Sequence, residues 1–591
     1  MRVQPPRRRC SDTAPLLVLA LFVLLGPAAL VAQSPSPPDS AALVEAAREA
    51  QRDFERFRQH NIPRDRAPRA GRCDRLIGRM CIWFGGEGEA NFPPEPEETG
   101  KMRRSLIGTL LRARHEIADP WVVGQLVHYM VEAGEYDAAE QVSEVCGIEA
   151  QWWCTALTGY SLHVRGDVVA AEAAFRGSLA MMPTDERERW ATSRYVLSEE
   201  GVEMFQTLEP SARERLHELF WRLSDPLFLV DGNDRLTDHF ARLVEARNHV
   251  DAAHPHGLEW GVDLQETLIR YGRIVGWSRG SSPVAPQLGS RRLPQDNRGL
   301  VGHHHPMSRG YLFPEAFLES PADIPPESWI SAPREARTWY APPYAPDMRA
   351  LETQVGRFRR GDGMLVVGAY RPARPADDDG TAGAPVEAGL FLVPEDGRPL
   401  RAERGDVAEG VFALRAPPGR YVSSLEVLDP DGRRAWRARQ GVRQDPLAPG
   451  EVDVSDLLIL SPDAPFPGTL EEAIPRVRPG IEVGRGERFT VVWEAYGLEV
   501  REPVQVTLGF TRGRLGFLER VGEFLGIIEP DRPVEVSFAE TAPDEVESVF
   551  RAMVIELPDI DPGEYTLHLR LGTSGGEGVT TSRPVIVVEQ P

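Results

Sequence analysis

The chain has 591 residues and a mass of 65.6 kDa, enough for about three to five domains. Hydrophobic residues make up 41% and charged residues 26%, which argues against a wholly disordered or fibrous protein. The net charge of −22 argues against nucleic acid as a partner, because phosphates need a basic surface. Phosphate-cradling loops and dinucleotide fingerprints are absent from the sequence, so we expect no cofactor.

The first 32 residues have the three parts of a secretory signal peptide. Arg7 to Arg9 precede the apolar run Ala14 to Leu25, and Ala32 offers a small residue before a cut at Gln33. We expect cleavage there and export to the periplasm, the cell envelope or the medium. The alternative is an uncleaved membrane anchor, because residues 14–32 are 19 residues long and could just span a bilayer.

Four cysteines remain after the signal peptide, in two pairs with the same spacing of eight residues. An even set in an exported protein favours disulfides, here Cys73–Cys81 and Cys146–Cys154. A straight helix would hold such cysteines about 12 Å apart, so each pair needs a turn, and Gly147 can supply one. The crossed pairings stay open, as does a four-cysteine zinc site that lacks the usual short C-x2–4-C spacing.

The first half of the chain has helical periodicity. Ser40 is a plausible N-cap, and the apolar residues that follow, up to Phe57, recur along one helix face. We expect a disulfide-containing helical region over residues 33–115, interrupted by a proline-rich stretch at residues 92–98.

Residues 116–205 contain two copies of a 32-residue unit, aligned on Gly134 and Gly166. The second copy carries Gly159, Phe175 and the closing Pro183 at matching positions, and the unit resembles the tetratricopeptide repeat. The resemblance implies a helical pair in each copy and a concave groove for a peptide or protein partner. A short spacer packed on its neighbours is the alternative.

Residues 206–280 contain a second set of landmarks, which resembles the GWxTD domain. This bacterial family is named for its own motif and has no assigned biochemical activity. Glu259 and Val262 depart from the motif. The landmarks that match are Asp225-Pro226, Asn233-Asp234, Trp260, Asp263, Arg270, Tyr271 and Gly272. The resemblance implies an exported multidomain protein and supplies no catalytic residues. From the residues themselves, we expect Trp260 to be a buried anchor and Asp263 to cap a turn before a strand at residues 267–271.

Two patterns invite a catalytic or metal-binding interpretation. Ser278 lies in a G-x-S-x-G sequence, but Ser281 to Pro283 cannot readily open the helix that a nucleophile elbow needs after its strand. His303, His304 and His305 are weak metal candidates, with His254 and His256 upstream. Adjacent side chains diverge, so we expect a polar loop, no metal and no catalytic residues.

Residues 281–350 are rich in proline and predict an irregular strap over the neighbouring domains. Its aromatic residues Trp329, Trp339 and Tyr340 could instead stack on a glycan. The chain after residue 350 predicts two β-sandwiches, residues 351–462 and 463–591, from short strands separated by turns. Tyr421 and Tyr565 each follow a Pro-Gly turn, which resembles the tyrosine corner of immunoglobulin-like sandwiches.

These elements predict a multidomain α plus β protein: a helical-repeat region, a small α/β GWxTD-like domain and two immunoglobulin-like sandwiches. We expect an exported, non-enzymatic scaffold of the bacterial cell envelope that binds a protein partner through its repeats or sandwiches. The alternative is an uncharacterised enzyme or a glycan-binding protein. Its site would lie between the GWxTD-like segment and the strap, near Asp263, Arg270 or His303 to His305.

Overall fold

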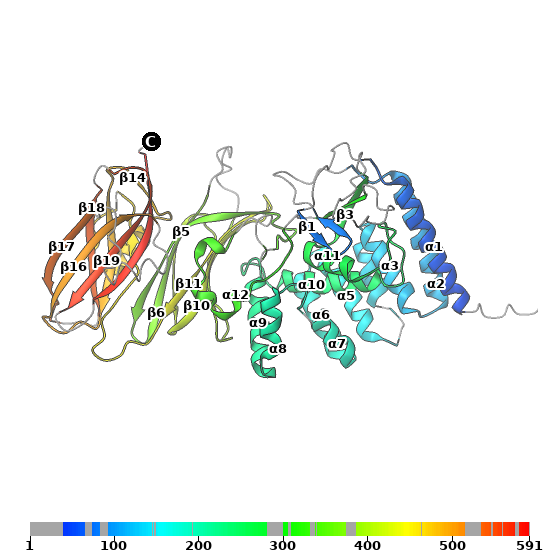
Figure 1. Ribbon diagram of the computed structural model, residues 1–591, viewed down its shortest axis with the longest axis horizontal. Helices are drawn as coiled ribbons and strands as arrows, with labels where there is room; N and C mark the ends of the chain where they lie inside the picture. The colour runs from blue at the N-terminus through cyan, green and yellow to red at the C-terminus, as the bar shows by residue number, and fades with distance from the viewer. Residues whose placement is uncertain are drawn as a thin grey trace, which may run out of the picture.

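The computed structural model shows a mixed α/β multidomain protein, with helices in the first half and β-sheets in the second (Figure 1). It describes residues 40–64, 74–82, 93–144, 146, 149–191, 193–279, 300–304, 309–330, 337, 340–373, 386–462, 464–513, 534–544, 548–557, 560–573 and 578–589. The predicted signal peptide, the predicted Cys73–Cys81 bond, His305 and Trp339 lie outside this part. Within it, no helix is both long and apolar enough to cross a bilayer.

The helical half begins, as expected, with a helix at Ser40. Its helices are α1 (Ser40–Asn61), α2 (Glu97–Glu116), α3 (Pro120–Glu132), α4 (Tyr136–Glu144), α5 (Gln151–Arg165), α6 (Val168–Met181), α7 (Thr184–Ala191), α8 (Glu199–Thr207), α9 (Pro210–Ser224), α10 (Asp234–Asn248) and α11 (Val262–Tyr271). Two small antiparallel sheets accompany them, β1 (Arg75–Ile77) with β2 (Met80–Ile82) and β3 (Ile274–Arg279) with β4 (Leu300–His304). The short helices α12 (Ala316–Glu319), η2 (Pro321–Asp323) and η3 (Pro326–Ser328) follow.

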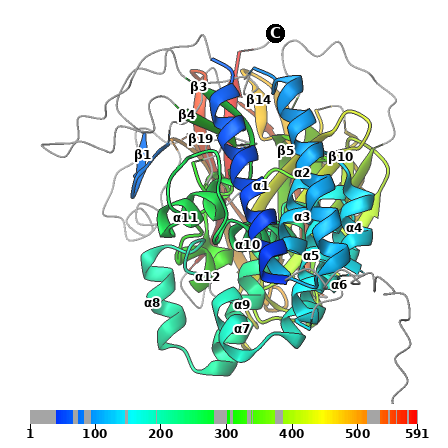
Figure 2. The ribbon, with the colours of Figure 1, turned by 90° about the vertical axis from the view of Figure 1, so that its right-hand side faces the viewer.

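Helices α3 to α6 form two successive hairpins, and specific residues define where these helices begin and end (Figure 2). The Asp119 carboxylate accepts hydrogen bonds from the first amides of α3. Gly166 ends α5 at a φ of 95°, a left-handed conformation that glycine adopts without strain. A Cβ on Gly159 would lie 2.9 Å from the ring of Phe175, so α5 and α6 approach closely only because this position is glycine.

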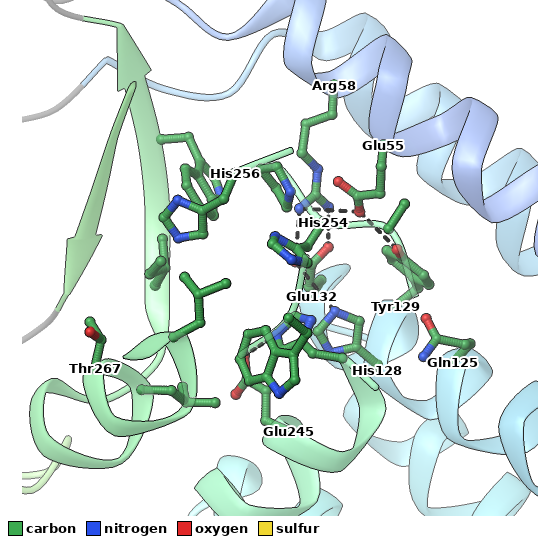
Figure 3. A pocket seen from close by; sticks show the side chains of 18 of the residues that line it. Glu55, Arg58, Gln125, His128, Tyr129, Glu132, Glu245, His254, His256 and Thr267 are labelled. Atoms are coloured by element: carbon green, nitrogen blue, oxygen red, sulfur yellow. Dashed lines mark hydrogen bonds and ion pairs between the residues drawn. The ribbon is translucent and has the colours of Figure 1, made fainter. Parts of the chain in front are cut away.

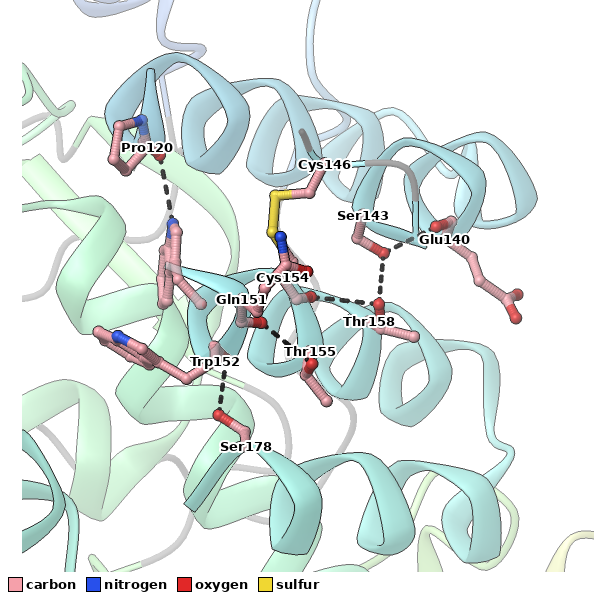
Figure 4. Close-up of a disulfide and its surroundings, with 11 residues drawn as sticks. Pro120, Glu140, Ser143, Cys146, Gln151, Trp152, Cys154, Thr155, Thr158 and Ser178 are labelled. Carbon is pink, nitrogen blue, oxygen red and sulfur yellow. Dashed lines mark hydrogen bonds between the residues drawn. A yellow bond between two sulfur atoms is a disulfide. The ribbon is translucent and has the colours of Figure 1, made fainter. Parts of the chain in front are cut away.

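A disulfide joins Cys146, which follows α4, to Cys154 in the first turn of α5 (Figure 4). The two Cα atoms lie 5.6 Å apart, and both residues are buried. The predicted local pairing is therefore confirmed for this pair of cysteines. Nearby, the Thr158 hydroxyl donates to Ser143 Oγ at 3.0 Å, which ties α5 to α4 a second time.

The first β-domain is one folded-over sheet of seven strands in the order β8-β7-β10-β11-β5-β6-β9. Its strands are β5 (Asp347–Arg360), β6 (Gly363–Pro372), β7 (Glu387–Pro394), β8 (Arg401–Gly405), β9 (Gly410–Ala416), β10 (Gly419–Asp429) and β11 (Arg434–Gln444). The long strand β5 pairs with β11 through residues 347–350 and with β6 through residues 351–360. It therefore belongs to both layers of a sandwich, whose core contains Leu390, Tyr370 and Trp436.

The second β-domain packs two sheets over a core centred on Trp493. One sheet contains β12 (Asp453–Val454), β13 (Leu458–Ile459), β15 (Arg488–Tyr496) and β18 (Val549–Glu556). Strand β15 pairs with each of the other three strands. The other contains β14 (Glu482–Gly484), β16 (Pro503–Arg512), β17 (Val534–Thr541), β19 (Gly563–Thr573) and β20 (Val579–Val588). The short helices α13 (Leu470–Ala473) and η4 (Ile474–Arg476) connect them. Leu458 and Ile459, which lie in the range predicted for the first sandwich, pair with β15 of the second β-domain.

The helical half and the first β-domain share one continuous core, in which Phe228 contacts Phe391. The segment between α9 and α10 runs through this core without a helix or strand of its own. Arg439 of β11 donates to the carbonyl oxygens of Leu223 at 2.8 Å and Asp225 at 2.6 Å. Glu426 of β10 accepts from the Leu229 amide at 3.1 Å and lies 3.8 Å from the Arg439 guanidinium. Both charged side chains are almost completely buried.

We expect Arg439→Ala to destabilise the protein by about 3–5 kcal/mol, because it removes the positive charge beside the buried Glu426 and the donor to the carbonyl groups of Leu223 and Asp225. The matched control is Arg443→Ala on the same strand, whose side chain is exposed and whose removal should change stability by no more than about 0.5 kcal/mol. Chemical denaturation followed by circular dichroism measures both. Equal stability of the two variants would contradict the importance of this junction.

Candidate functional site

A polar cavity lies beside Trp260, enclosed by α1, α3, α10, α11, the loop between α10 and α11, and the small β3–β4 sheet (Figure 3). About 50 Å³ of it is open to water-sized molecules. Its ionisable and aromatic lining residues are Glu55, Arg58, His128, Tyr129, Glu132, Glu245, His249, His254, His256, Trp260, Trp277 and His304. A second pocket of about 180 Å³ adjoins it and shares Arg58, Glu132, Ile274 and Trp277 with it.

An ion pair between α1 and α3 closes one side of the cavity. The Arg58 guanidinium donates to both carboxylate oxygens of Glu132 and lies 3.7 Å from Glu55. Arg103 of α2 also donates to Glu132, at 3.2 Å. Burial opposes ionisation of Glu132, but the charges of Arg58 and Arg103 outweigh it and hold the pKa of this carboxyl well below its usual range.

Two other carboxyl groups of the cavity have pKa values shifted in the opposite direction. Burial raises the pKa of Glu55 to about 7, although Arg58 lies close by. Burial likewise raises the pKa of Glu245 to about 7 against the opposing charge of Arg273. The cavity therefore combines one permanently charged carboxylate, Glu132, with two carboxyl groups that gain or lose a proton near neutral pH.

The histidines of the cavity are neutral at pH 7. Burial lowers the pKa of His128, His254 and His304 to about 4 and that of His256 to about 3. The rings form a chain of edge-on contacts, with centroids 5.3 Å apart for His128 and His249 and 5.7 Å apart for His254 and His256. Among the described residues, no group of three or more histidine, cysteine, aspartate or glutamate side chains is placed to hold a metal ion.

Five polar atoms of lining residues have no hydrogen-bond partner within the described part of the protein: Glu55 Oε2, Arg58 Nε, His128 Nδ1 and both ring nitrogens of His254. The four residues that carry these atoms are each at most 5% exposed. The other oxygen of Glu55 accepts from the Tyr129 hydroxyl at 2.7 Å. Buried polar groups almost always have a partner, so these atoms have hydrogen-bonding capacity that the described residues do not use.

Trp260, which we expect to be a buried anchor, lines the cavity and is half-buried. Its ring lies on that of His249, with centroids 4.5 Å apart. Asp263 faces away from the cavity and accepts two hydrogen bonds from the Arg79 guanidinium, each at 2.7 Å. Those bonds lower the pKa of Asp263 to about 2 against the opposing effect of burial.

The predicted strand at residues 267–271 is the second half of α11 and not a strand. Leu264, Leu268 and Tyr271 recur at helical spacing and are buried on one face, and this burial stabilises the helical conformation of the segment. Asp263 therefore lies in the first turn of a helix and not in a turn before a strand. Its negative charge there interacts favourably with the helix dipole.

The last three residues of the predicted motif fix neighbouring segments. Arg270 Nε donates to the carbonyl of Tyr195 at 2.8 Å, and the Tyr271 hydroxyl donates to the carbonyl of Arg309 at 3.2 Å. Gly272 has a φ of 86°, and its carbonyl accepts from His304 Nδ1 at 2.6 Å. Through this bond Gly272 orients His304, which lines the cavity.

His303 and His304 are buried in strand β4, so the expectation of a polar loop is wrong for these two residues. Because successive side chains of a strand point to opposite faces of the sheet, the two imidazole rings lie on opposite sides of β4. His303 Nε2 is hydrogen-bonded to Ser278 Oγ at 2.8 Å. Ser278 itself lies inside β3 and is fully buried, which confirms that the G-x-S-x-G sequence forms no exposed nucleophile elbow.

The aromatic residues considered as glycan platforms are part of the core where the structure describes them. Trp329 is 5% exposed and packs edge-on against Phe317, with ring centroids 4.6 Å apart. Tyr340 is 8% exposed and faces the guanidinium of Arg235. Neither ring is available for stacking on a sugar.

The sequence interpretation missed most of the cavity, although α3 carried a usable signal. Gln125, His128 and Glu132 interrupt an otherwise apolar helix at a spacing of three and four residues, so they share one face. Polar side chains on the buried face of a helix need partners, and here they face the cavity. Glu55 of α1 and Glu245 of α10 gave no such signal, because only the tertiary fold brings these helices together.

No family model matches the chain, and no curated protein sequence is similar to it. Among solved structures, red sea bream transglutaminase matches part of the chain with 11% sequence identity and a TM-score of 0.13. The match covers 40% of this chain and 32% of that enzyme, so this chain spans about a third of its length. A likeness this weak carries no argument about fold or function.

We expect Glu55→Gln to gain stability relative to the wild type as the pH rises from about 4.5 to about 7. The folded-state pKa of Glu55 is raised, so the stability that its protonated form contributes is complete below the unfolded pKa and is lost as the pH rises through about 7. Glutamine keeps the acceptor for Tyr129 and does not titrate. The change in relative stability should be about 3 kcal/mol, measured by chemical denaturation across this pH range.

The control for this series is Glu45→Gln on the same helix, whose side chain is 65% exposed. Its stability profile should run parallel to that of the wild type at every pH. If the stability of Glu55→Gln also ran parallel to that of the wild type at every pH, Glu55 would not be a buried, protonated carboxyl group.

Proposed function

We propose that the cavity beside Trp260 is a binding site for a small, neutral, polar solute, and that the rest of the protein is an exported frame around it. The observation that carries the proposal is the set of unpartnered buried atoms on its wall, which belong to Glu55, Arg58, His128 and His254. The walls of the cavity come from α1, α3 and residues 245–277, and His304 is its one lining residue from the proline-rich segment among the described residues.

The charge of the lining favours a neutral ligand. Arg58 and Glu132 neutralise each other, the histidines are uncharged, and Glu55 and Glu245 are protonated below a pH of about 7. An ion would enter such a space at the cost of its hydration and meet no net opposite charge. A molecule with both a donor and an acceptor would satisfy the buried carboxyl and imidazole groups.

The size of the cavity limits the ligand to a few heavy atoms. Its space of about 50 Å³ for water-sized molecules holds more than the single water that about 15 Å³ accommodates. Glu55 and Glu245 can also exchange a proton with a bound molecule near neutral pH, which is the requirement for general acid–base chemistry. Binding is therefore the proposed function, and acid–base catalysis is the reaction class that this site could support.

Acetamide is a suitable probe, because it is small and neutral and has both a donor and an acceptor. We expect it to raise the Tm of the wild type by about 2 °C at ten times its Kd, whereas acetate and methylammonium should not. His254→Phe, which replaces a polar wall with an apolar ring, should abolish the shift.

The matched control for the acetamide experiment is His115→Phe at the exposed end of α2, which should keep the full shift. Absence of a shift in the wild type, or the same shift in both variants, would overturn the proposed site.

A second candidate function is that of an exported, non-enzymatic scaffold of the bacterial cell envelope that binds a protein partner. The packing of Gly159 on Phe175 supports tetratricopeptide-like repeats in α3 to α6. The Tyr421 hydroxyl donates to the carbonyl of Pro417 at 3.0 Å, and that of Tyr565 to Asp561 at 2.8 Å. This repeated bond, four residues back along the chain, supports tyrosine corners and two immunoglobulin-like sandwiches.

In this proposal residues 206–280 form a GWxTD-like domain, residues 1–32 are cleaved as a signal peptide, and a membrane is touched only if that signal is retained. Mass spectrometry of the protein isolated from its native cells tests export. We expect a mature chain that begins at Gln33 and in which Cys146 and Cys154 are oxidised, as in the structure. A cytosolic chain that keeps residues 1–32 and has reduced cysteines would contradict it.

A further inference from the structure

A second and larger cavity lies between the two β-domains, far along the chain from Trp260. It is a cleft of about 670 Å³, within the range of about 300–1,000 Å³ typical of pockets for small organic ligands. Its walls come from the β5–β6 turn, the end of β11, the start of α13, and strands β15 and β18. Figure 1 shows the two β-domains side by side at the end of the molecule opposite the helices.

The two domains are held in a fixed position relative to each other, so the cleft is preformed. The buried amide nitrogen of Gln354 in β5 donates to the carbonyls of Ile459 and Arg478 at 3.1 and 2.8 Å. In the opposite direction, Arg583 of β20 reaches across and donates to the carbonyls of Leu457 and Val355. When a ligand binds to a preformed cleft, little conformational entropy is lost in ordering its walls.

The floor of the cleft carries a buried acceptor that the described part of the protein leaves unused. Gln444 is 2% exposed, and its Nε2 donates to the carbonyl of Gly363 at 2.8 Å. That bond fixes the orientation of the amide, and Gln444 Oε1 has no hydrogen-bond partner among the described residues. A ligand that reaches this oxygen would pair with it through a hydroxyl or amine donor.

The charged groups of the cleft are largely paired with one another. Arg360 donates to both carboxylate oxygens of Glu494, at 2.6 and 3.1 Å, and lies 3.6 Å from Glu471. The Tyr496 hydroxyl donates to Glu494 at 2.7 Å. The exposed carboxylates of Glu471 and Asp362 remain at the rim as further acceptors. This balance disfavours a strongly charged ligand and favours one that donates many hydrogen bonds.

The cleft also has an apolar side, formed by the half-buried Leu447 and Phe550. Acceptors on the floor and rim beside an apolar wall match a sugar ring, which has hydroxyl groups around its edge and C–H groups on its faces. We propose that the cleft between the β-domains binds a neutral saccharide. This site is independent of the cavity beside Trp260, and either proposal can fail without the other.

The test uses the full chain on an array of defined neutral oligosaccharides, followed by calorimetric titration of the best trisaccharide. Gly468→Trp is the blocking variant. A Cβ at Gly468 would meet only the flexible carboxylate of Glu472, at 3.7 Å, so an indole there can fill the cleft without disturbing the core. Val407→Trp is the matched control, an equally large change at an exposed position of the first β-domain outside the cleft.

We expect the trisaccharide to bind the wild type and Val407→Trp equally and to bind Gly468→Trp at least tenfold more weakly. Gln444→Leu should weaken binding as well, and circular dichroism establishes that each variant is folded. Absence of binding to any oligosaccharide would overturn the proposal, as would equal binding by Gly468→Trp and the wild type. A proline-rich or other peptide that binds in place of sugars and is lost in Gly468→Trp would overturn the ligand class.

Discussion

The buried hydrogen bonds that Arg439 donates to Leu223 and Asp225, and that Glu426 accepts from Leu229, are the constraint on which much of the structure depends. The segment between α9 and α10 passes through the core without secondary structure, so its peptide groups need partners from elsewhere. Strands β10 and β11 supply them with charged side chains, and the burial of each charge is tolerated because the other lies nearby. The segment leads directly into α10, which carries Glu245 and His249 to the cavity beside Trp260. The first β-domain thus helps to position a site that it does not contact.

The cavity shows how position decides the charge of chemically identical groups. Glu55 and Glu132 are both buried and both near Arg58, and burial alone would keep both protonated. Glu132 receives two hydrogen bonds from Arg58 and a third from Arg103, whereas Glu55 lies 3.7 Å from the guanidinium and accepts from a tyrosine. The direct bonds decide the difference. One carboxyl becomes a fixed charge, and the other remains able to hold a proton near neutral pH.

Both proposed binding sites lie where elements distant in the sequence meet, and in both a buried polar atom lacks a partner among the described residues. In the helical half the atoms belong to Glu55, Arg58, His128 and His254, and the space is small. Between the β-domains the atom is Gln444 Oε1, and the space is larger and reaches a rim of exposed carboxylates. Local structure is well satisfied in both places, since helices and sheets pair their own backbone. The unsatisfied groups are side chains at junctions, where binding sites are common.

The sequence by itself determined the helical first half, the β-rich second half and the two helix hairpins, and it favoured the Cys146–Cys154 pairing. These follow from periodicity, turn residues and a short loop, all of which act over a few residues. The sequence did not determine the fate of residues 262–271, because an Asp-capped turn and the first turn of a helix have similar local chemistry until Leu264 and Leu268 find a core. It also did not place Leu458 and Ile459, whose strand partner β15 is some 30 residues away. The cavity and the cleft were decided by tertiary structure alone, because burial and opposing charges arise only when distant helices and sheets pack together.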